Sequence, residues 1–549
     1  MSSSKKGKKV NGKKVKDMKK NILNIALLVC QLVLTTGLSL MTVSCESELD
    51  IEKHGNLGSQ DTYYTTDENV NSATASLYLE MRSLFYTWYI TKNCLSDDAW
   101  AGGSARGDNN DMERLNEYTF DTDNGMIQSL YSGLYSVIYK ANLIIDKTEG
   151  ETAVMKRAIN EAKVFRAWAH FELVTLWGTS PVVDHLLDPS EYRQGNSTPE
   201  EHWALIESDL KTAIESGTLP SKTSVNDEET GIRVTKELAQ AFLGKAYLFQ
   251  GRYSEAATML DNVINSGKYA LFTADAYDMQ FRARYNNNCE SLFELQKRND
   301  QEQMWNQCDF LMCMIGWRSD VLSYTGTAND IVAQGTYGFM NPRKSLYDAF
   351  VDWEMTKGNG TGYRMNKTLL NYDQMVELGV SVNPGASVYG NEGYFTWKTQ
   401  ALKEDCVMDL SGLQILQYND LKVMRYAEVL LLAAEAHLQN GSAKALDYIN
   451  QVRTRAQETP LASVTLEDIK AEKRLELCLE AIRYQDLVRW GDAMTVMGEQ
   501  GKEVPSFSTT GVKWGFQNTN YGFKERNKLL PIPLKEMDVN PNMNKNEGW

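Results

Sequence analysis

One short repeat constrains the fold of this chain more than any other feature. Residues 239–260 read AQAFLGKAYLFQGRYSEAATML, and residues 427–449 repeat the plan one residue shorter as AEVLLLAAEAHLQNGSAKALDYI. Gly244 and Ala256 are small enough to let two helices approach closely, and Leu260 fills the space beside them. A unit of this kind buries its apolar face only by stacking on a neighbour. The repeat therefore predicts stacked helix pairs.

The spacing within these pairs resembles the tetratricopeptide (TPR) pattern, and residues 161–178 resemble the first helix of another pair. Apolar residues at intervals of three and four predict further helices along the chain. The predicted helices cover residues 66–85, 127–146, 154–176, 421–439, 443–455 and 466–489. Tyr-rich and Gly-rich stretches at 93–124 and about 285–400 interrupt this pattern with turn signals. The predicted fold class is mostly helical (all-α), a TPR-like helix-pair scaffold with long irregular loop insertions and a few short strands.

The N-terminus has the layout of a secretory signal. The first twenty residues contain nine lysines and one acid, and no charged residue follows from Asn21 to Cys45. Ser44 before Cys45 resembles a bacterial lipobox, which predicts cleavage and a lipid on Cys45, although Thr42 stands where leucine is usual. The alternative is an uncleaved transmembrane anchor, because the run is long enough to span a bilayer. Met18 is an alternative start of the signal.

The net negative charge of the chain argues against some classes of binding partner. The chain has a formal net charge of −15, and removal of the signal's +8 (nine Lys minus one Asp) leaves −23. Nucleic acid is a poor partner for such a body, since that affinity comes from neutralising phosphates with Lys and Arg. No cofactor is expected: the five histidines are scattered and the cysteines form no CxxC pair. A structural calcium ion stays open, although no oxygen-ligand loop is spelled out.

The predicted organisation has a leader and one globular unit. Residues 1–44 form the signal peptide, and 45–60 the lipidated cysteine with its tether. An N-terminal helical region covers 61–270. A C-terminal region covers 271–549, with the insertion at about 285–400 facing the ligand and the closing helices following it.

Four motifs in order resemble the SusD/RagB family of outer-membrane glycan-binding lipoproteins. They are EAKVFRAWAHFELVTLWGTSPVV (161–183), VMRYAEVLLLAAEA with YINQVRTRA (423–436 and 448–456), EKRLELCLEAIRYQDLVRWGD (472–492) and LLPIPLKEMDVNPNMNKNEGW (529–549). The resemblance covers essentially all of Cys45 to Trp549. It implies a lipid-anchored protein on the cell surface that captures oligosaccharides. It also implies that the protein acts as a lid on a SusC-type TonB-dependent transporter and is not an enzyme.

The first candidate binding region is the loop at 96–110, SDDAWAGGSARGDNN. A sugar ring stacks on a flat aromatic side chain, and the hydroxyls at its rim donate and accept hydrogen bonds. In starch-binding members of the family a Trp in this loop stacks on glucose, and Trp100 looks like its counterpart. The polar candidates beside it are Asp97, Asp98, Arg106 and Asn109. The alternative is that the two aspartates cap a turn and Trp100 packs under the loop.

The second candidate region runs from Gln301 to Ser319 in the central insertion. By resemblance to the family, Trp305 and Trp317 are further stacking aromatics, with Arg318 at the edge. Tyr337 and Trp397 are weaker candidates. On this interpretation, Trp100→Ala and Trp317→Ala weaken glycan binding and leave thermal stability nearly unchanged.

Catalysis finds no support in the sequence. A glycosidase needs two carboxyl groups held roughly 5–10 Å apart. Asp97 and Asp98 are adjacent, so on a strand their side chains point to opposite faces. The chain has no Gly-x-Ser-x-Gly elbow and no HExxH motif. The competing hypothesis is that the chain is a TPR-type protein that binds peptides. An elongated cleft lined with Asn and backbone-binding groups would favour a peptide ligand, whereas exposed Trp and Tyr with polar edges would favour a sugar.

Overall fold

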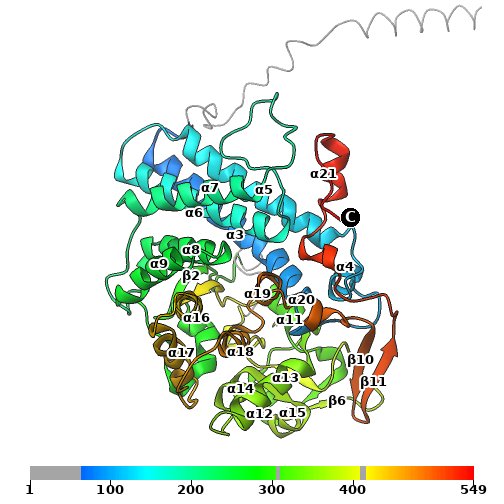
Figure 1. The fold of residues 1–549 in the computed structure, drawn as a ribbon. Coiled ribbons are helices and arrows are strands. Elements are labelled where there is room, and N and C mark those ends of the chain that lie inside the picture. The colour runs from blue at the N-terminus through cyan, green and yellow to red at the C-terminus, as the bar shows by residue number, and fades with distance from the viewer. Residues whose placement is uncertain (1–62, 304–309, 408–413, 415) are drawn as a thin grey trace, which may run out of the picture. The chain divides into compact units, whose positions relative to one another are not determined.

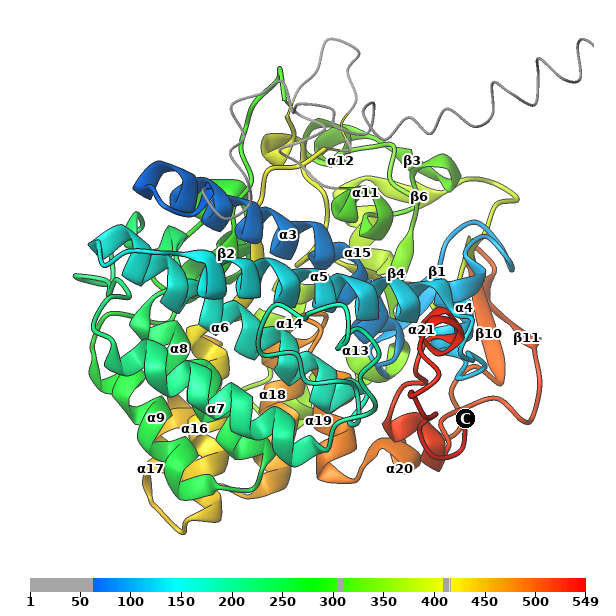
Figure 2. The ribbon, with the colours of Figure 1, turned by 90° about the horizontal axis from the view of Figure 1, so that it is seen from above.

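Long helices dominate the computed structural model, which describes residues 63–303, 310–407, 414 and 416–549. The N-terminal helices are α3 (Asp67–Cys94), α4 (Asn110–Asn116), α5 (Gly125–Lys147), α6 (Ala153–Leu176), α7 (Pro199–Glu215), α8 (Lys236–Phe249) and α9 (Tyr253–Asn265). From α5 to α9 each helix packs on the next one in the chain, and α3 packs on α5 and α6 (Figure 2). Residues Tyr64–Trp549 form one compact unit.

The C-terminal helices continue the same stack, although a long insertion separates them from it in sequence. They are α16 (Tyr426–Gln439), α17 (Lys444–Arg455), α18 (Leu466–Leu477), α19 (Arg483–Trp490), α20 (Ala493–Met497) and α21 (Leu534–Val539). Helix α16 packs on α9, α17 and α18, so the two predicted helix pairs lie side by side (Figure 1). A Cβ atom added at Gly244 would lie 2.7 Å from Leu260 Cγ, which confirms the predicted close approach.

Short helices make up the insertion that lies between α9 and α16 in sequence. The helices there are α11 (Leu311–Ile315), α12 (Gly326–Ile331), α13 (Lys344–Phe350), α14 (Tyr363–Thr368) and α15 (Tyr372–Leu378). The 3₁₀ segments are η1 (Thr230–Ile232), η2 (Ala274–Phe281), η3 (Ala283–Tyr285), η4 (Ser319–Val321), η6 (Lys403–Asp405) and η7 (Glu525–Lys528), and η5 (Val351–Thr356) is a π-helix.

The strands form small antiparallel sheets. Pairs join β1 (Ala99–Gly102) to β4 (Phe339–Pro342), β2 (Ser291–Leu295) to β9 (Leu421–Arg425), β3 (Leu322–Tyr324) to β6 (Val380–Val382) and β5 (Leu369–Asn371) to β8 (Tyr394–Thr396). One sheet has the order β11 (Gly511–Phe516), β10 (Glu503–Ser508), β7 (Val388–Tyr389). The prediction of a mostly helical fold with a few short strands is confirmed.

Two predicted helices differ from the structure, because strand pairing in one and ion pairs in the other outweigh the helical periodicity of the sequence. Residues 421–425 form strand β9 rather than the first turn of a helix, because they pair with β2. The helix predicted over 466–489 breaks into α18 and α19. Leu479 and Ala481 have φ values of 61° and hold Glu480 between them in reach of Arg425. A non-glycine residue at positive φ is strained, so the ion pairs of Glu480 offset this cost.

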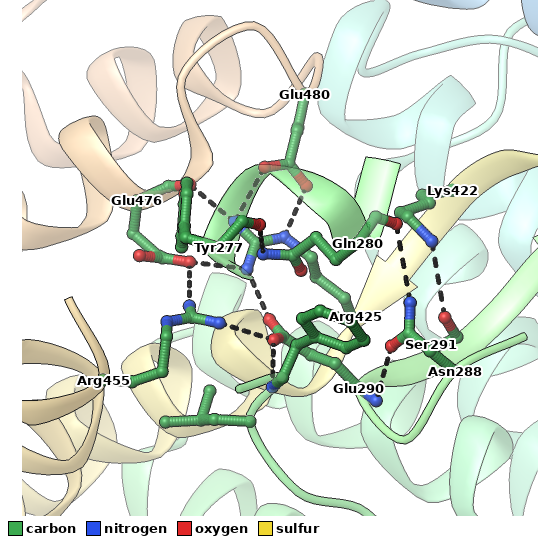
Figure 3. A network of polar contacts seen from close by, with 12 residues as sticks. Tyr277, Gln280, Asn288, Glu290, Ser291, Lys422, Arg425, Arg455, Glu476 and Glu480 are labelled. Atoms are coloured by element: carbon green, nitrogen blue, oxygen red, sulfur yellow. Dashed lines mark hydrogen bonds and ion pairs between the residues drawn. The ribbon is translucent and has the colours of Figure 1, made fainter. Parts of the chain in front are cut away.

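A buried ion network joins the insertion to the C-terminal helices. Figure 3 shows Arg425 between Glu476, Glu480 and Glu290, with its Nη1 atom 2.6 Å from Glu476 Oε1. Arg455 bonds to Glu290 and Glu476. The cations of the network are Arg364, Lys398, Arg425, Arg453 and Arg455, and its anions are Glu290, Glu354, Glu472, Glu476 and Glu480. Five positive charges thus balance five negative ones.

Two buried histidines give the stack a pH-dependent stability. His170 on α6 and His202 on α7 are both fully buried, with their Nδ1 atoms 3.1 Å apart. Burial, the neighbouring His202 and then Arg166 lower the pKa of His170 well below its usual value. The native imidazole therefore stays neutral at a pH where the unfolded chain binds a proton, so stability falls as the pH drops below about 6.5.

We expect the free energy of unfolding to fall by about 1.4 kcal/mol per pH unit below this point because of His170. Urea unfolding of the wild type between pH 7.5 and 5 measures the slope, and His170→Gln should flatten it. The exposed His185, whose pKa is raised by Asp184 and Glu191, provides the control. His185→Gln should leave the acid-side slope in place; an unchanged slope in His170→Gln would show that the buried pair does not cause it.

Candidate functional site

Trp100 lies inside the fold rather than on an open face. Its side chain on β1 is 5% exposed, and its Nε1 donates a hydrogen bond to Glu392 Oε2 at 2.8 Å. The guanidinium of Arg343 lies 3.6 Å from the ring centroid, and Trp514 packs edge-on against it at 6.1 Å. The prediction of an exposed stacking face at Trp100 is wrong, because these neighbours cover the indole.

Asp97 and Asp98 hold distant helices instead of a ligand. Both side chains are buried. Asp97 pairs with Arg483 at 2.8 Å and with Arg474 at 2.9 Å, and Asp98 pairs with Arg474 at 2.8 Å. Burial alone would raise the pKa of Asp97, but Arg474 and Arg483 outweigh it and lower that pKa, whereas burial raises the pKa of Asp98. The two carboxylates therefore fix β1 to α18 and α19.

Arg106 and Asn109 shape the loop that follows β1. The Nη2 atom of Arg106 donates to Glu117 Oε2 at 2.9 Å, and its Nε lies 3.6 Å from Glu113 Oε2. Asn109 caps α4, since its Oδ1 accepts a hydrogen bond from the backbone N–H of Met112 at 3.1 Å. Both predicted polar residues thus have partners within the loop and its helix.

Trp317 is part of the core of the insertion. It is 1% exposed, its Nε1 donates to Thr396 O at 2.8 Å, and its ring packs against Phe395 and Trp397. Its backbone N–H donates to Gln400 Oε1 at 3.1 Å. The predicted exposed face is therefore wrong here as well. Trp305 lies outside the described residues.

The two predicted regions nevertheless meet at a cleft of about 420 Å³. Its walls come from the loop after β1, from the start of η4 and from the segment before β4. The lining residues are Ser104, Asp108, Arg318, Ser319, Asp320, Gly335, Thr336, Tyr337 and Phe339. We call this the tyrosine cleft. Of the predicted candidates, Arg318 and the weaker candidate Tyr337 line it.

Strand pairing explains why these segments meet. Gly102 on β1 lies opposite Phe339 on β4, and the backbone N–H of Gly103 donates to Gly338 O at 2.9 Å. Gly338 in turn donates to Gly316 O at 2.9 Å, which places Arg318 beside the same ribbon. Gly338 has a φ of 76°, and a Cβ atom there would lie 2.5 Å from Arg318 Cβ. Glycine is therefore required at this junction.

Tyr337 supplies the open aromatic surface of the cleft. It is 46% exposed, and Phe310 packs against its ring edge-to-face at 5.6 Å. Its backbone N–H donates to Cys313 O at 2.9 Å, which fixes its position. The sequence alone makes Tyr337 only a weaker candidate. The pairing of β1 with β4, which no local pattern reveals, places Tyr337 in the cleft beside the loop after β1.

Polar groups line the same cleft as Tyr337. Arg318 Nη2 bonds to Asp320 Oδ2 at 2.6 Å, and Arg318 Nε is buried without a hydrogen-bond partner among the described residues. Asp108 Oδ2 accepts from the backbone N–H of Ser104 at 2.7 Å. An aromatic face beside such donors and acceptors suits a pyranose ring. Within the described residues no group of three or more His, Cys, Asp or Glu side chains is placed to hold a metal ion.

Two family models match the chain. The "SusD family" model matches residues 371–549, and the model described as "Starch-binding associating with outer membrane" matches residues 49–248. The chain belongs to the SusD/RagB family. The family motifs also meet in space: Trp177 Nε1 donates to Pro531 O at 3.0 Å, and Asn546 Nδ2 donates to Trp177 O at 2.8 Å.

Relatives of this SusD/RagB protein match over most of their length. A SusD-like protein of Bacteroides ovatus is 26% identical, over 84% of this chain and 82% of its own. The starch-binding protein SusD of Bacteroides thetaiotaomicron is 24% identical, over 80% of this chain and 82% of its own. The solved structure of a laminarin-binding SusD-like protein has a TM-score of 0.72 at 27% identity and covers 88% of this chain and all of its own. Among the described residues of this chain, no helix is long and apolar enough to span a membrane.

Proposed function

We propose that this protein is a cell-surface glycan-binding lipoprotein that captures oligosaccharides at the tyrosine cleft. The observation that carries the proposal is the meeting of exposed Tyr337 with Arg318 and Asp108 in one open cleft. The aromatic ring offers the surface for C–H stacking, and the charged groups offer hydrogen bonds to ring hydroxyls. The names of the related proteins, which bind starch or laminarin, support the same ligand class.

The proposal extends to location and partner. The lipid on Cys45 tethers the helical body to the outer face of the outer membrane, and the body acts as a lid on a SusC-type TonB-dependent transporter. The protein delivers its ligand and performs no catalysis. The family models and the relatives above, whose names describe binding, support this assignment.

The Tyr337→Ala variant tests the ligand site. Loss of one stacking surface should weaken glycan binding about tenfold, which corresponds to about 1.4 kcal/mol. Calorimetric titration of residues 46–549 with starch-derived and laminarin-derived oligosaccharides measures it. Tyr139→Ala removes a tyrosine of similar exposure (55%) from α5, outside the cleft, and should change neither affinity nor stability. Equal affinities of the wild type and Tyr337→Ala would contradict the assignment of the cleft.

A further inference from the structure

A second cleft lies along the N-terminal part of α3. It has a volume of about 660 Å³ and is formed by α3, the start of α6, the end of η1 with the residue after it, and the end of β2 with the residue after it. The lining residues are Asn71, Ala75, Tyr78, Leu79, Arg82, Arg157, Ile232, Arg233, Leu295 and Gln296. We call it the arginine cleft, because its charged lining residues are three arginines. In a chain of net charge −15 such a site is a local exception.

One buried carboxylate organises the cleft. Glu161 lies beneath the lining, fully buried, and Arg233 bonds to both of its oxygens at 2.8 Å. The hydroxyl of Tyr78 donates to Glu161 Oε2 at 3.1 Å and accepts from the backbone N–H of Val234 at 2.8 Å. These contacts fix the positions of Tyr78 and Arg233. Arg233 and Arg157, whose Nε lies 3.6 Å from Glu161 Oε1, thus lie around one negative charge.

Arg157 makes long contacts within the cleft and stays partly exposed. Its Nη2 lies 3.4 Å from Asn71 Oδ1 and its Nε lies 3.6 Å from Glu161 Oε1. The Nε atom is buried without a hydrogen-bond partner among the described residues, whereas the side chain as a whole is 30% exposed. A guanidinium group binds a carboxylate through two parallel hydrogen bonds when its donors are available. The geometry therefore favours an anionic ligand at Arg157.

The apolar part of the lining decides the class of ligand. Leu79 and Ile232 are 49% and 42% exposed at this cleft, and both are aliphatic. Tyr78 has its ring packed against Phe165 and Phe293, so it offers little surface for stacking on a sugar. Aliphatic surface beside arginines matches a polypeptide that carries both carboxylates and aliphatic side chains. We infer that the arginine cleft binds an acidic peptide segment of a partner protein, a role separate from glycan capture.

A defined peptide tests the inference. The probe is an octapeptide of alternating Glu and Leu with blocked ends, titrated calorimetrically into residues 46–549 at about 50 mM salt, where screening is weak. Saturable binding is expected, and Arg157→Gln should weaken it about fivefold to tenfold, since it removes one charge-assisted pair. Lys156→Gln removes the same charge one residue along α6, outside the lining, and should weaken binding less than about twofold.

Other outcomes would overturn the inference. If an octapeptide with Gln in place of Glu binds as tightly as the Glu/Leu octapeptide, the cleft does not recognise carboxylates. If Lys156→Gln weakens binding as much as Arg157→Gln does, the effect comes from net charge and not from the cleft. Tighter binding of polygalacturonate than of the peptide would assign the cleft to an acidic glycan instead. Neutral glycan binding at the tyrosine cleft should be the same in Arg157→Gln and wild type, which separates this test from that of the proposed function.

Discussion

Replacing Glu476 with glutamine should remove about 3–5 kcal/mol from the free energy of unfolding, because it leaves a buried positive charge uncompensated. Glu476 is fully buried and contacts three arginines: Arg364 at 2.9 Å, Arg425 at 2.6 Å and Arg455. Burial alone would raise its pKa, but Arg455, Arg425 and Arg364 together lower it. The stability that this carboxylate contributes is thus present above the pKa of an unfolded glutamate and is lost as the pH falls through the lower native value.

Urea unfolding at pH 7.5 measures this prediction. Glu499→Gln is the matched control, because Glu499 is 87% exposed and forms an ion pair at the surface with Lys502. The control should change stability by less than about 0.5 kcal/mol. The double variant Glu476→Gln with Arg455→Gln should lose less than the sum of the two single variants, since it restores charge balance. A loss below about 1 kcal/mol in Glu476→Gln would show that the network does not act as a unit.

Trp317→Ala should destabilise the protein by about 3–5 kcal/mol. The substitution empties a core position between Phe395 and Trp397 and leaves Thr396 O without its donor. Its effect on glycan affinity in the fraction that remains folded should be small, because the indole does not reach the tyrosine cleft lining.

Trp514→Ala provides the comparison for Trp317→Ala. Trp514 on β11 is 50% exposed, so its truncation should cost less than about 1 kcal/mol. Thermal unfolding of both variants, with glycan titration at 20 °C or below, separates the two effects. If Trp317→Ala keeps wild-type stability but binds glycan weakly, Trp317 is a ligand-binding residue and not a core residue.

The fold was largely predictable because its signals are local. Gly244 and Ala256 marked a close helix pair, and Thr152 and Thr198 lie at the helix starts, where they accept hydrogen bonds from Met155 and Glu201 backbone N–H groups. Periodicity failed where distant partners decide the structure. Strand β9 forms because β2 lies beside it, and the break before α19 forms around the ion pairs of Glu480.

The site was predictable only in part. Asp97 and Asp98 pair with arginines 386 and 376 positions away, so no local pattern distinguishes them from ligand-binding carboxylates. The family resemblance indicated Trp317 as a stacking residue, but the structure buries its indole in the core of the insertion. The loop after β1 and Arg318, one from each predicted region, meet in one cleft, and glycan binding there stays a proposal. Tyr337 gains its position in that cleft from the pairing of β1 with β4, which no local pattern reveals.

Glycan binding to a protein with a disabled tyrosine cleft is the most direct test of the central claim. The triple variant Asp108→Asn, Arg318→Gln, Tyr337→Ala changes the three side chains that carry the proposal. Calorimetric titration with an oligosaccharide that binds the wild type should show no measurable binding by the triple variant. The wild type should release no shorter product from that oligosaccharide. Wild-type affinity in the triple variant, or turnover of the oligosaccharide by the purified protein, would contradict the account.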